Sequence, residues 1–245
     1  MATYDSSISA FPNQTLQFIW LIQEASFRDK MFAVGHLAFS YLTGKASEGL
    51  LNTKANVPLL LTLAVLPDVD LLFPMLMHGG PTHSVILYLA LAFPAILIWK
   101  KQTIPYLIAI ISHPLLGDYL TRITQPSGVQ LLYPLTSEWF AAGVEGAMSL
   151  YVYLELVLFV IFLVMMLVTK DRLMLIKPHS SNWLLSIPKA TALLPVFLQF
   201  PIPVPVELVI PHVILMALLG IPILIDLKAL LTKFLHNARN YRVFN

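Results

Sequence analysis

The sequence predicts an all-α protein, a polytopic transmembrane helical bundle of about six spans in which some helices are short or broken. Hydrophobic residues make up 58% of the 245 residues and charged residues only 11%, and the mean hydropathy is +0.77. Ordinary soluble domains carry roughly 25% charged residues. The apolar residues gather in runs near the length of a membrane span, and backbone groups in lipid are satisfied within helices.

The first apolar segments are irregular. Residues 16–27 have apolar positions at helical spacing but are too short to cross a bilayer, which favours an interfacial helix. Residues 31–43 form a short apolar helix. Residues 57–77 are long enough to cross, but two prolines and two aspartates interrupt them: Pro67, Asp68, Asp70 and Pro74. Because a proline removes one hydrogen bond of the helix, we expect a break at the two aspartates.

The later segments are longer and more regular. Residues 84–99 and 104–121 are expected to form an antiparallel hairpin of helices, followed by a mixed loop over 122–147. Residues 150–169 are the clearest single span. Residues 190–227 are rich in proline and predict two short helices joined by a turn at 201–207, with a basic tail from Lys228. We treat residues 1–245 as one membrane domain, with most polar groups at 31–136 and additional transmembrane helices at 148–245.

Basic residues predict the orientation of the bundle. They fall into four clusters in alternate loops: Lys45 and Lys54, Lys100 and Lys101, residues 170–177, and residues 228–242. Cytoplasmic loops of membrane proteins carry an excess of lysine and arginine, so this side is expected to be cytoplasmic. The polar residues of the spans then converge on the extracytoplasmic side of a multi-pass protein.

Composition also limits the function. A net charge of +2, with its basic residues in separate clusters, argues against a nucleic-acid partner bound through a basic groove. The chain contains no cysteine, which excludes thiolate metal sites and a cysteine nucleophile. Any metal ion must therefore be held by histidine, aspartate or glutamate.

Seven residues are candidates for such a site. They lie within apolar segments or at the outer ends of these segments: His36, Asp68, Asp70, His78, His83, His113 and Asp118. Acids and imidazoles in lipid are costly unless paired or ligated, which makes them functional candidates. Imidazole and carboxylate suit zinc, manganese or iron, and seven groups exceed the three or four that one zinc takes. We therefore expect one or two divalent ions, with zinc first.

Each candidate also has a structural alternative. Asp68 or Asp70 can cap the helical turn after Pro67, and two residues so close in sequence do not share a helix face. His78 can be a surface loop residue. The remaining histidines, His179, His212 and His236, do not cluster with acids and are expected to be structural.

The spacing of His113 and Asp118 predicts an irregular helix. Residues five apart lie about 140° apart around an α-helix and cannot reach one ion. Pro114 weakens the hydrogen bonding one turn earlier, and the extra residue can be absorbed as a π-type turn, which often occurs at functional sites. Gly117 eases the adjustment because it has no Cβ.

Five motifs in order give a resemblance to a known family. They are Gly35-His36, Leu66-Pro67-Asp68-Val69-Asp70, His78 with Thr82-His83-Ser84, Ser112-His113 with Asp118 and Thr121, and residues 128–134 (GVQLLYP). This set, over about residues 31–136, resembles the YdjM-like family of membrane-bound, inner-membrane metal-dependent hydrolases. That family is distantly similar to zinc-dependent phospholipase C, an all-helical enzyme with a zinc cluster. The resemblance implies that the seven candidate residues are the metal-site residues.

The chain departs from the family pattern at two places. The family usually places three residues between the histidine and the aspartate, whereas this chain has four, residues 114–117. The family usually has an arginine after its first loop histidine, whereas this chain has Gly79. The second change removes a phosphate-binding candidate and leaves Arg122 and Lys30 as the basic residues on that side.

These observations predict a membrane-embedded metal-dependent hydrolase. Its expected substrate is a phosphodiester or ester bond of a lipid or of a membrane-proximal molecule, with the bilayer as partner and Asp70 or Asp118 as the catalytic base. The alternative is a metal-ion or proton-coupled transporter that uses the same groups, and a third is a membrane-organising protein without activity. A transporter needs access from both faces, whereas these groups gather near one face. The substrate and the oligomeric state stay open.

Overall fold

The computed structural model describes residues 31–73, 75–122, 128–144, 147–176, 186–199 and 204–243. The predicted interfacial helix at 16–27, Lys30, Pro74 and His179 lie outside these residues, as does the first part of the predicted turn at 201–207.

The described residues fold into helices, which confirms the predicted fold class. The first half contains α2 (Ala33–Leu51), α3 (Val57–Val65), the 3-10 helices η2 (Leu66–Leu72) and η3 (Pro81–His83), α4 (Val85–Trp99), the 3-10 turn η4 (Lys100–Thr103), α5 (Ile104–Ser112), the π-helical turn η5 (His113–Asp118) and α6 (Tyr119–Thr121). The second half contains α7 (Met148–Val168), α8 (Arg172–Ile176), α9 (Ile187–Gln199) and α10 (Val206–Val243). In the described part of the chain, the β-structure is one isolated bridge between Val129 and Phe140.

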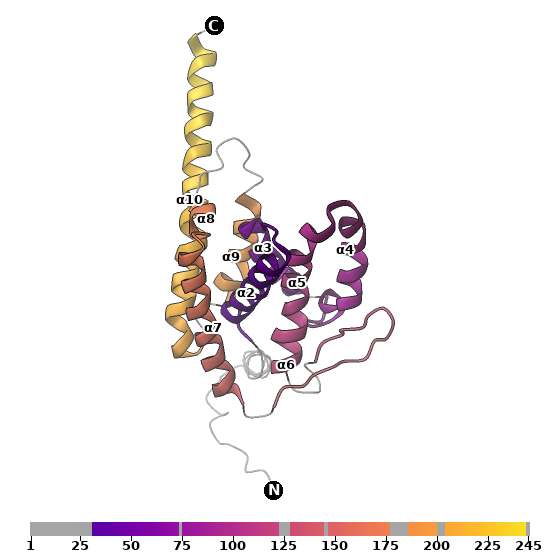
Figure 1. The fold of residues 1–245 in the computed structure, drawn as a ribbon. Helices are drawn as coiled ribbons and strands as arrows, with labels where there is room; N and C mark the ends of the chain where they lie inside the picture. Colours follow the sequence, from indigo (N-terminus) through magenta and orange to yellow (C-terminus); the bar gives the residue numbers. More distant parts are fainter. Residues whose placement is uncertain are drawn as a thin grey trace.

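Helices α2, α3 and α5 lie in the centre of the molecule, with α7 to α10 on one side and α4 at the opposite edge (Figure 1). Their apolar side chains form one core that joins both halves of the chain, including Leu37, Tyr41, Leu60, Phe162 and Leu215. Because burial of such side chains stabilises by about 1.5–3 kcal/mol each, α2 is fixed against both halves.

Among the described residues, three helical stretches are long and apolar enough to cross a membrane: Val85–Thr121, Ser149–Val168 and Val206–His236. The first is not one straight helix, because Lys100 adopts a positive φ of 50° and reverses the chain between α4 and α5. The predicted hairpin of 84–99 and 104–121 is therefore confirmed, and α4 and α5 lie side by side (Figure 1).

The structure corrects two predicted boundaries. The short helix expected at 31–43 continues to Leu51 as α2. The expected pair of short helices in 190–227 is wrong for its second member, because α10 is 38 residues long and includes the predicted basic tail. Pro211 and Pro222 lie inside it, and membrane helices tolerate proline where neighbouring groups satisfy the freed carbonyls.

The predicted break in 57–77 is confirmed. Helix α3 ends at Val65, and the chain continues as the 3-10 helix η2, which contains both Asp68 and Asp70. A 3-10 helix has about three residues per turn and not 3.6. Asp68 and Asp70 therefore point in other directions than they would if α3 continued as an α-helix. Both side chains are buried.

A buried glutamate fixes the start of α2. The Glu155 carboxylate, from α7, accepts hydrogen bonds from the backbone N–H of Phe32 (3.0 Å) and of Gly35 (3.2 Å). A carboxylate at a helix N-terminus satisfies N–H groups that have no partner within the helix. Gly35 is needed here, because a Cβ at this position would lie 2.7 Å from the Glu155 carboxylate. This contact places the next residue, His36.

Candidate metal centre

The structure brings all seven predicted residues into one cluster. His36 comes from α2, Asp68 and Asp70 from η2, His83 from η3, and His113 and Asp118 from η5. These six are buried, whereas His78, in the loop before η3, is half-buried. Three sets within the cluster have ligand atoms within 4.8 Å of one another: His36, His113 and Asp118; Asp68, His83 and His113; and Asp70, His78 and His83.

Hydrogen bonds orient the two central histidines toward the middle of the cluster. The His113 Nδ1–H donates to the Ala64 carbonyl oxygen at 2.6 Å, because a carbonyl can only accept. The His83 Nδ1 lies 3.3 Å from Asp70 Oδ2. With Nδ1 of His113 bonded to the Ala64 carbonyl and Nδ1 of His83 beside Asp70 and the Thr82 hydroxyl, each ring turns its Nε2 atom to the cluster, the arrangement found for histidine ligands in metalloproteins.

Four distances relate these Nε2 atoms to Asp68 and Asp118. His83 Nε2 lies 3.1 Å from Asp118 Oδ2 and 3.7 Å from Asp68 Oδ1. His113 Nε2 lies 3.3 Å from each of the same two oxygens. Two atoms bound to one tetrahedral zinc at about 2.0–2.1 Å are about 3.3 Å apart. The spacing of the two Nε2 atoms and Asp68 Oδ1 thus fits one zinc-sized ion, and Asp118 Oδ2 lies next to the same position.

Several of these atoms lack a hydrogen-bond partner, although they are buried. They are His36 Nδ1, His83 Nε2, His113 Nε2 and Asp118 Oδ2. Buried polar atoms in native proteins are nearly always paired, because an unpaired one costs about 1–3 kcal/mol. A shared cation explains three of them, His83 Nε2, His113 Nε2 and Asp118 Oδ2, which face one another, whereas His36 Nδ1 lies against Gly117.

The predicted π-type turn is confirmed. Residues His113–Asp118 form a π-helix, and it turns both side chains to the same side, where His113 Nε2 and Asp118 Oδ2 are 3.3 Å apart. The His36 ring stacks on the His113 ring with centroids 3.7 Å apart. Gly117 makes room for this stack, because a Cβ there would overlap Cε1 and Nδ1 of His36.

The overlap of the three sets limits how many ions they hold. One ring nitrogen binds one ion, so the two sets that share His113 are alternatives for a single ion. The set with Asp68 also has both histidine Nε2 atoms, whereas His36 Nε2 is 3.8 Å from Asp118 Oδ1. The third set, Asp70, His78 and His83, could hold a second ion only through ring nitrogens that already take part in hydrogen bonds in this structure.

Asp70 and His78 also take part in a network of hydrogen bonds. Asp70 accepts from the Thr82 hydroxyl at 2.8 Å and from the Gly79 N–H at 3.2 Å. Arg122 donates to His78 Nε2, so the His78 Nδ1–H donates to Asp70 Oδ1 at 3.0 Å. Burial, followed by the nearby Arg122 charge, lowers the pKa of His78. His78 is therefore a neutral ring that links Arg122 to Asp70.

Arg122 is the site residue that the sequence did not assign a role. Its side chain is buried, and its Nε donates to Asp118 Oδ1 at 2.8 Å. Its guanidinium also fills the space beside Gly79, where a Cβ would lie 2.9 Å from Arg122 Nη1. Arg122 thus places a cation next to the position at which this chain lacks the family's loop arginine. The sequence contained one indication of this contact, because an arginine four residues after an aspartate can pair with it on one helix face.

Arg122→Ala is expected to lower the free energy of unfolding by about 3 kcal/mol, because it leaves the buried Asp118 oxygen and His78 nitrogen without their donor. The thermal unfolding midpoint in detergent measures the change. Arg172→Ala removes an exposed arginine of α8 and is the matched control, with an unchanged midpoint expected. Equal midpoints for both variants would contradict the proposed contacts of Arg122.

The fold and the cluster define an all-helical membrane protein with a buried histidine and aspartate centre suited to a metal ion. Comparison with known families gives the same class, since the YdjM inner membrane protein family model matches residues 31–200. The chain belongs to the YdjM inner membrane protein family. The match includes all seven cluster residues and extends beyond the predicted 136 to the end of α9. Comparisons with curated proteins and with solved structures found no match. The likeness to phospholipase C stays a prediction.

Proposed function

We propose that this protein is a metal-dependent hydrolase of the inner membrane that cleaves a phosphodiester or ester bond of a lipid or membrane-proximal substrate. The observation that carries the proposal is the set of buried nitrogen and oxygen atoms with no hydrogen-bond partner, spaced as the ligands of one ion. Zinc suits these donors best, and manganese or iron accept the same ones.

Each residue of the cluster has a role in this proposal. Asp68, His83 and His113 would hold the ion, a set of three protein ligands as in catalytic zinc sites. Zinc bound there would lower the pKa of a water molecule toward about 7 and polarise the scissile group. Asp118 Oδ2 lies within 3.3 Å of both histidine nitrogens and accepts a proton as general base.

The surrounding residues fix these groups. Arg122 holds Asp118 through Oδ1 and leaves Oδ2 turned to the cluster. Asp70 orients His83 through Nδ1 and is the second candidate base. Its oxygens already accept from Thr82 and Gly79, which favours Asp118 in that role. The Arg122 guanidinium supports a substrate with an anionic phosphate group.

A hydrolysis assay in detergent and in vesicles tests the proposal. Zinc-loaded protein is incubated with phospholipids of differing headgroup, and the released products are identified by mass spectrometry. We expect product with wild type, none after chelation, and recovery when zinc is returned. Absence of product from every phosphodiester and carboxylester lipid, together with metal flux into vesicles, would instead favour the transporter.

We also propose a multi-pass topology with the metal centre toward the extracytoplasmic side. Helix α6, which directly follows His113–Asp118, lies at one end of the bundle, and the turn between α4 and α5, with its lysines, lies at the other end (Figure 1). Since the chain has no cysteine, single cysteines report each end. Ser137→Cys is expected to react with an impermeant thiol reagent from outside, and Lys101→Cys only after the membrane is opened. The reverse pattern would overturn this orientation.

Position 79 is unsuitable for such a label. Gly79 has a positive φ of 84°, and a side chain there would meet the Gly128 carbonyl at 2.7 Å. Ser137 is exposed in the described loop after residue 128 and avoids this strain.

A further inference from the structure

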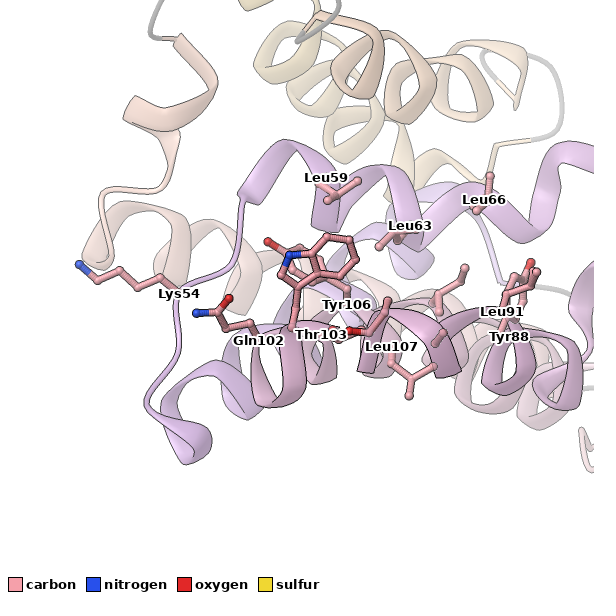
Figure 2. Close-up of a pocket in the computed structure, with 14 residues that line it drawn as sticks. Lys54, Leu59, Leu63, Leu66, Tyr88, Leu91, Gln102, Thr103, Tyr106 and Leu107 are labelled. Carbon is pink, nitrogen blue, oxygen red and sulfur yellow. Dashed lines mark hydrogen bonds between the residues drawn. The ribbon is translucent and has the colours of Figure 1, made fainter. Parts of the chain in front are cut away.

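Helix α3 packs against α9, and a cavity of about 600 Å³ lies between α3, α4 and α5 (Figure 2). The cavity is partly open, because Leu91 and Trp99 in its lining are exposed. Its volume is within the range of about 300–1,000 Å³ that is typical of ligand sites. Its walls are aliphatic or aromatic over most of their length, including Leu59, Leu63, Leu91 and Leu107.

The cavity runs along most of α4. Both Tyr88 and Trp99, at opposite ends of α4, line it, and at 1.5 Å per residue they are about 16 Å apart along the helix. This is about half of the roughly 30 Å hydrocarbon thickness of a bilayer, the depth reached by the chains of one leaflet. The dimensions fit a single hydrocarbon chain lying along the helices.

The two ends of the cavity differ in polarity. Lys54 and Gln102 lie at one end, and Leu66, Tyr88 and Leu91 lie at the other (Figure 2). The Tyr88 hydroxyl donates to the Thr82 carbonyl, so it is already satisfied at the apolar end. Lys54 is exposed, and among the described residues no acidic group forms an ion pair with it.

More positive charge surrounds the polar end. Lys100 and Lys101 form the turn η4 next to Gln102, and Lys101 Nζ donates to the Leu51 carbonyl at 3.2 Å. This bond brings Lys101 beside the segment that carries Lys54. Lysines at the end of an apolar slot between membrane helices match an anionic lipid headgroup.

We propose that this cavity binds one acyl chain of an anionic phospholipid, with its phosphate at Lys54 and Lys101 and its chain running toward Leu66 and Tyr88. The site is separate from the metal centre and does not depend on hydrolysis. Its apolar end is nevertheless joined to that centre, because Leu66 directly precedes Pro67 and Asp68 and Ile110 lies one turn before His113. A bound acyl chain would pack against Leu66 and Ile110, the cavity residues nearest in sequence to Asp68 and His113.

Quenching of Trp99 fluorescence by brominated lipid chains tests this site, because Trp99 lines the cavity. A protein with Trp20, Trp139 and Trp183 changed to phenylalanine keeps Trp99 as the single reporter. It is placed in vesicles of mainly zwitterionic lipid that contain an equal, minor fraction of brominated anionic or brominated zwitterionic lipid. We expect several-fold stronger quenching by the anionic lipid.

Paired variants separate the cavity from general contact with lipid. Ala92→Phe fills the cavity, and Ala90→Phe makes the same change on the exposed side of α4. Lys54→Gln with Lys101→Gln removes the charge, at roughly fivefold in affinity per lysine, and Lys228→Gln is its control on α10. The preference for anionic lipid should disappear in Ala92→Phe and in the double lysine variant, and persist in both controls.

Three results would overturn the proposal. Equal quenching by both lipids in the starting protein would mean ordinary contact with the bilayer. An unchanged preference in Ala92→Phe would place the lipid outside the cavity. An unchanged preference in the double lysine variant would exclude the proposed headgroup site.

Discussion

Asp68→Asn is expected to abolish metal binding, with affinity reduced at least about 100-fold. Asparagine keeps the shape of aspartate but removes the negative charge beside two histidine Nε2 atoms, which lie 3.3 Å and 3.7 Å from Asp68 Oδ1. The fold should survive, because asparagine has nearly the volume of aspartate, and volume-conserving changes at buried positions are tolerated best. Elemental analysis of the purified variant measures the bound metal, and the hydrolysis assay should show loss of product.

The matched control for this variant is Asp171→Asn. Asp171 is also buried, but its Oδ2 accepts from the Tyr41 hydroxyl at 2.7 Å and pairs with Lys45 at 3.2 Å, away from the cluster. We expect full metal content in that protein. An Asp68→Asn protein with wild-type metal content would exclude Asp68 from the site and leave Asp118 Oδ2 as the oxygen that His83 and His113 share.

Gly117→Ala is expected to displace His36 and destabilise the protein by about 1–3 kcal/mol, the usual cost of overpacking a filled site. The added Cβ would overlap the His36 ring, which is held from behind by its stack on His113. The thermal unfolding midpoint should fall. Hydrolysis should also fall, because movement of His36 disturbs the His113 ring.

Gly220→Ala is the control for this change. Gly220 lies inside α10, and a Cβ at this position meets nothing within 4 Å. Alanine in a helix interior is about 0.5–1 kcal/mol more favourable than glycine, so this variant should be neutral or more stable. A Gly117→Ala protein as stable and as active as Gly220→Ala would show that His36 is not packed against the π-turn.

Local sequence rules predicted the features that depend on residues near one another in the chain. Pro67 in an apolar run predicted the break that became η2, and the five-residue spacing of His113 and Asp118 predicted the π-turn. Both follow from backbone geometry within one or two turns. Histidines and aspartates are costly in apolar segments unless they are paired or ligated, and for this reason the sequence predicted that they share one site.

Contacts between distant segments were not predictable in this way. Glu155 binds the start of α2 across 120 or more residues, and Arg122 reaches His78 across 44. Which partner a buried charge selects depends on how the helices pack, and a single sequence does not contain that information. The sequence predicted a short helix in place of α10, because its prolines and its basic end were interpreted as helix breaks. In the structure both are part of one helix.

Metal analysis of the wild-type protein tests the central claim most directly. Protein purified in detergent without chelator is measured for transition metals, and X-ray absorption reports the ligands of the bound ion. We predict about one ion per chain, held by nitrogen and oxygen at about 2.0–2.1 Å. Protein that carries no zinc, manganese or iron, and binds none when they are added, would contradict the assignment of this cluster as a metal centre.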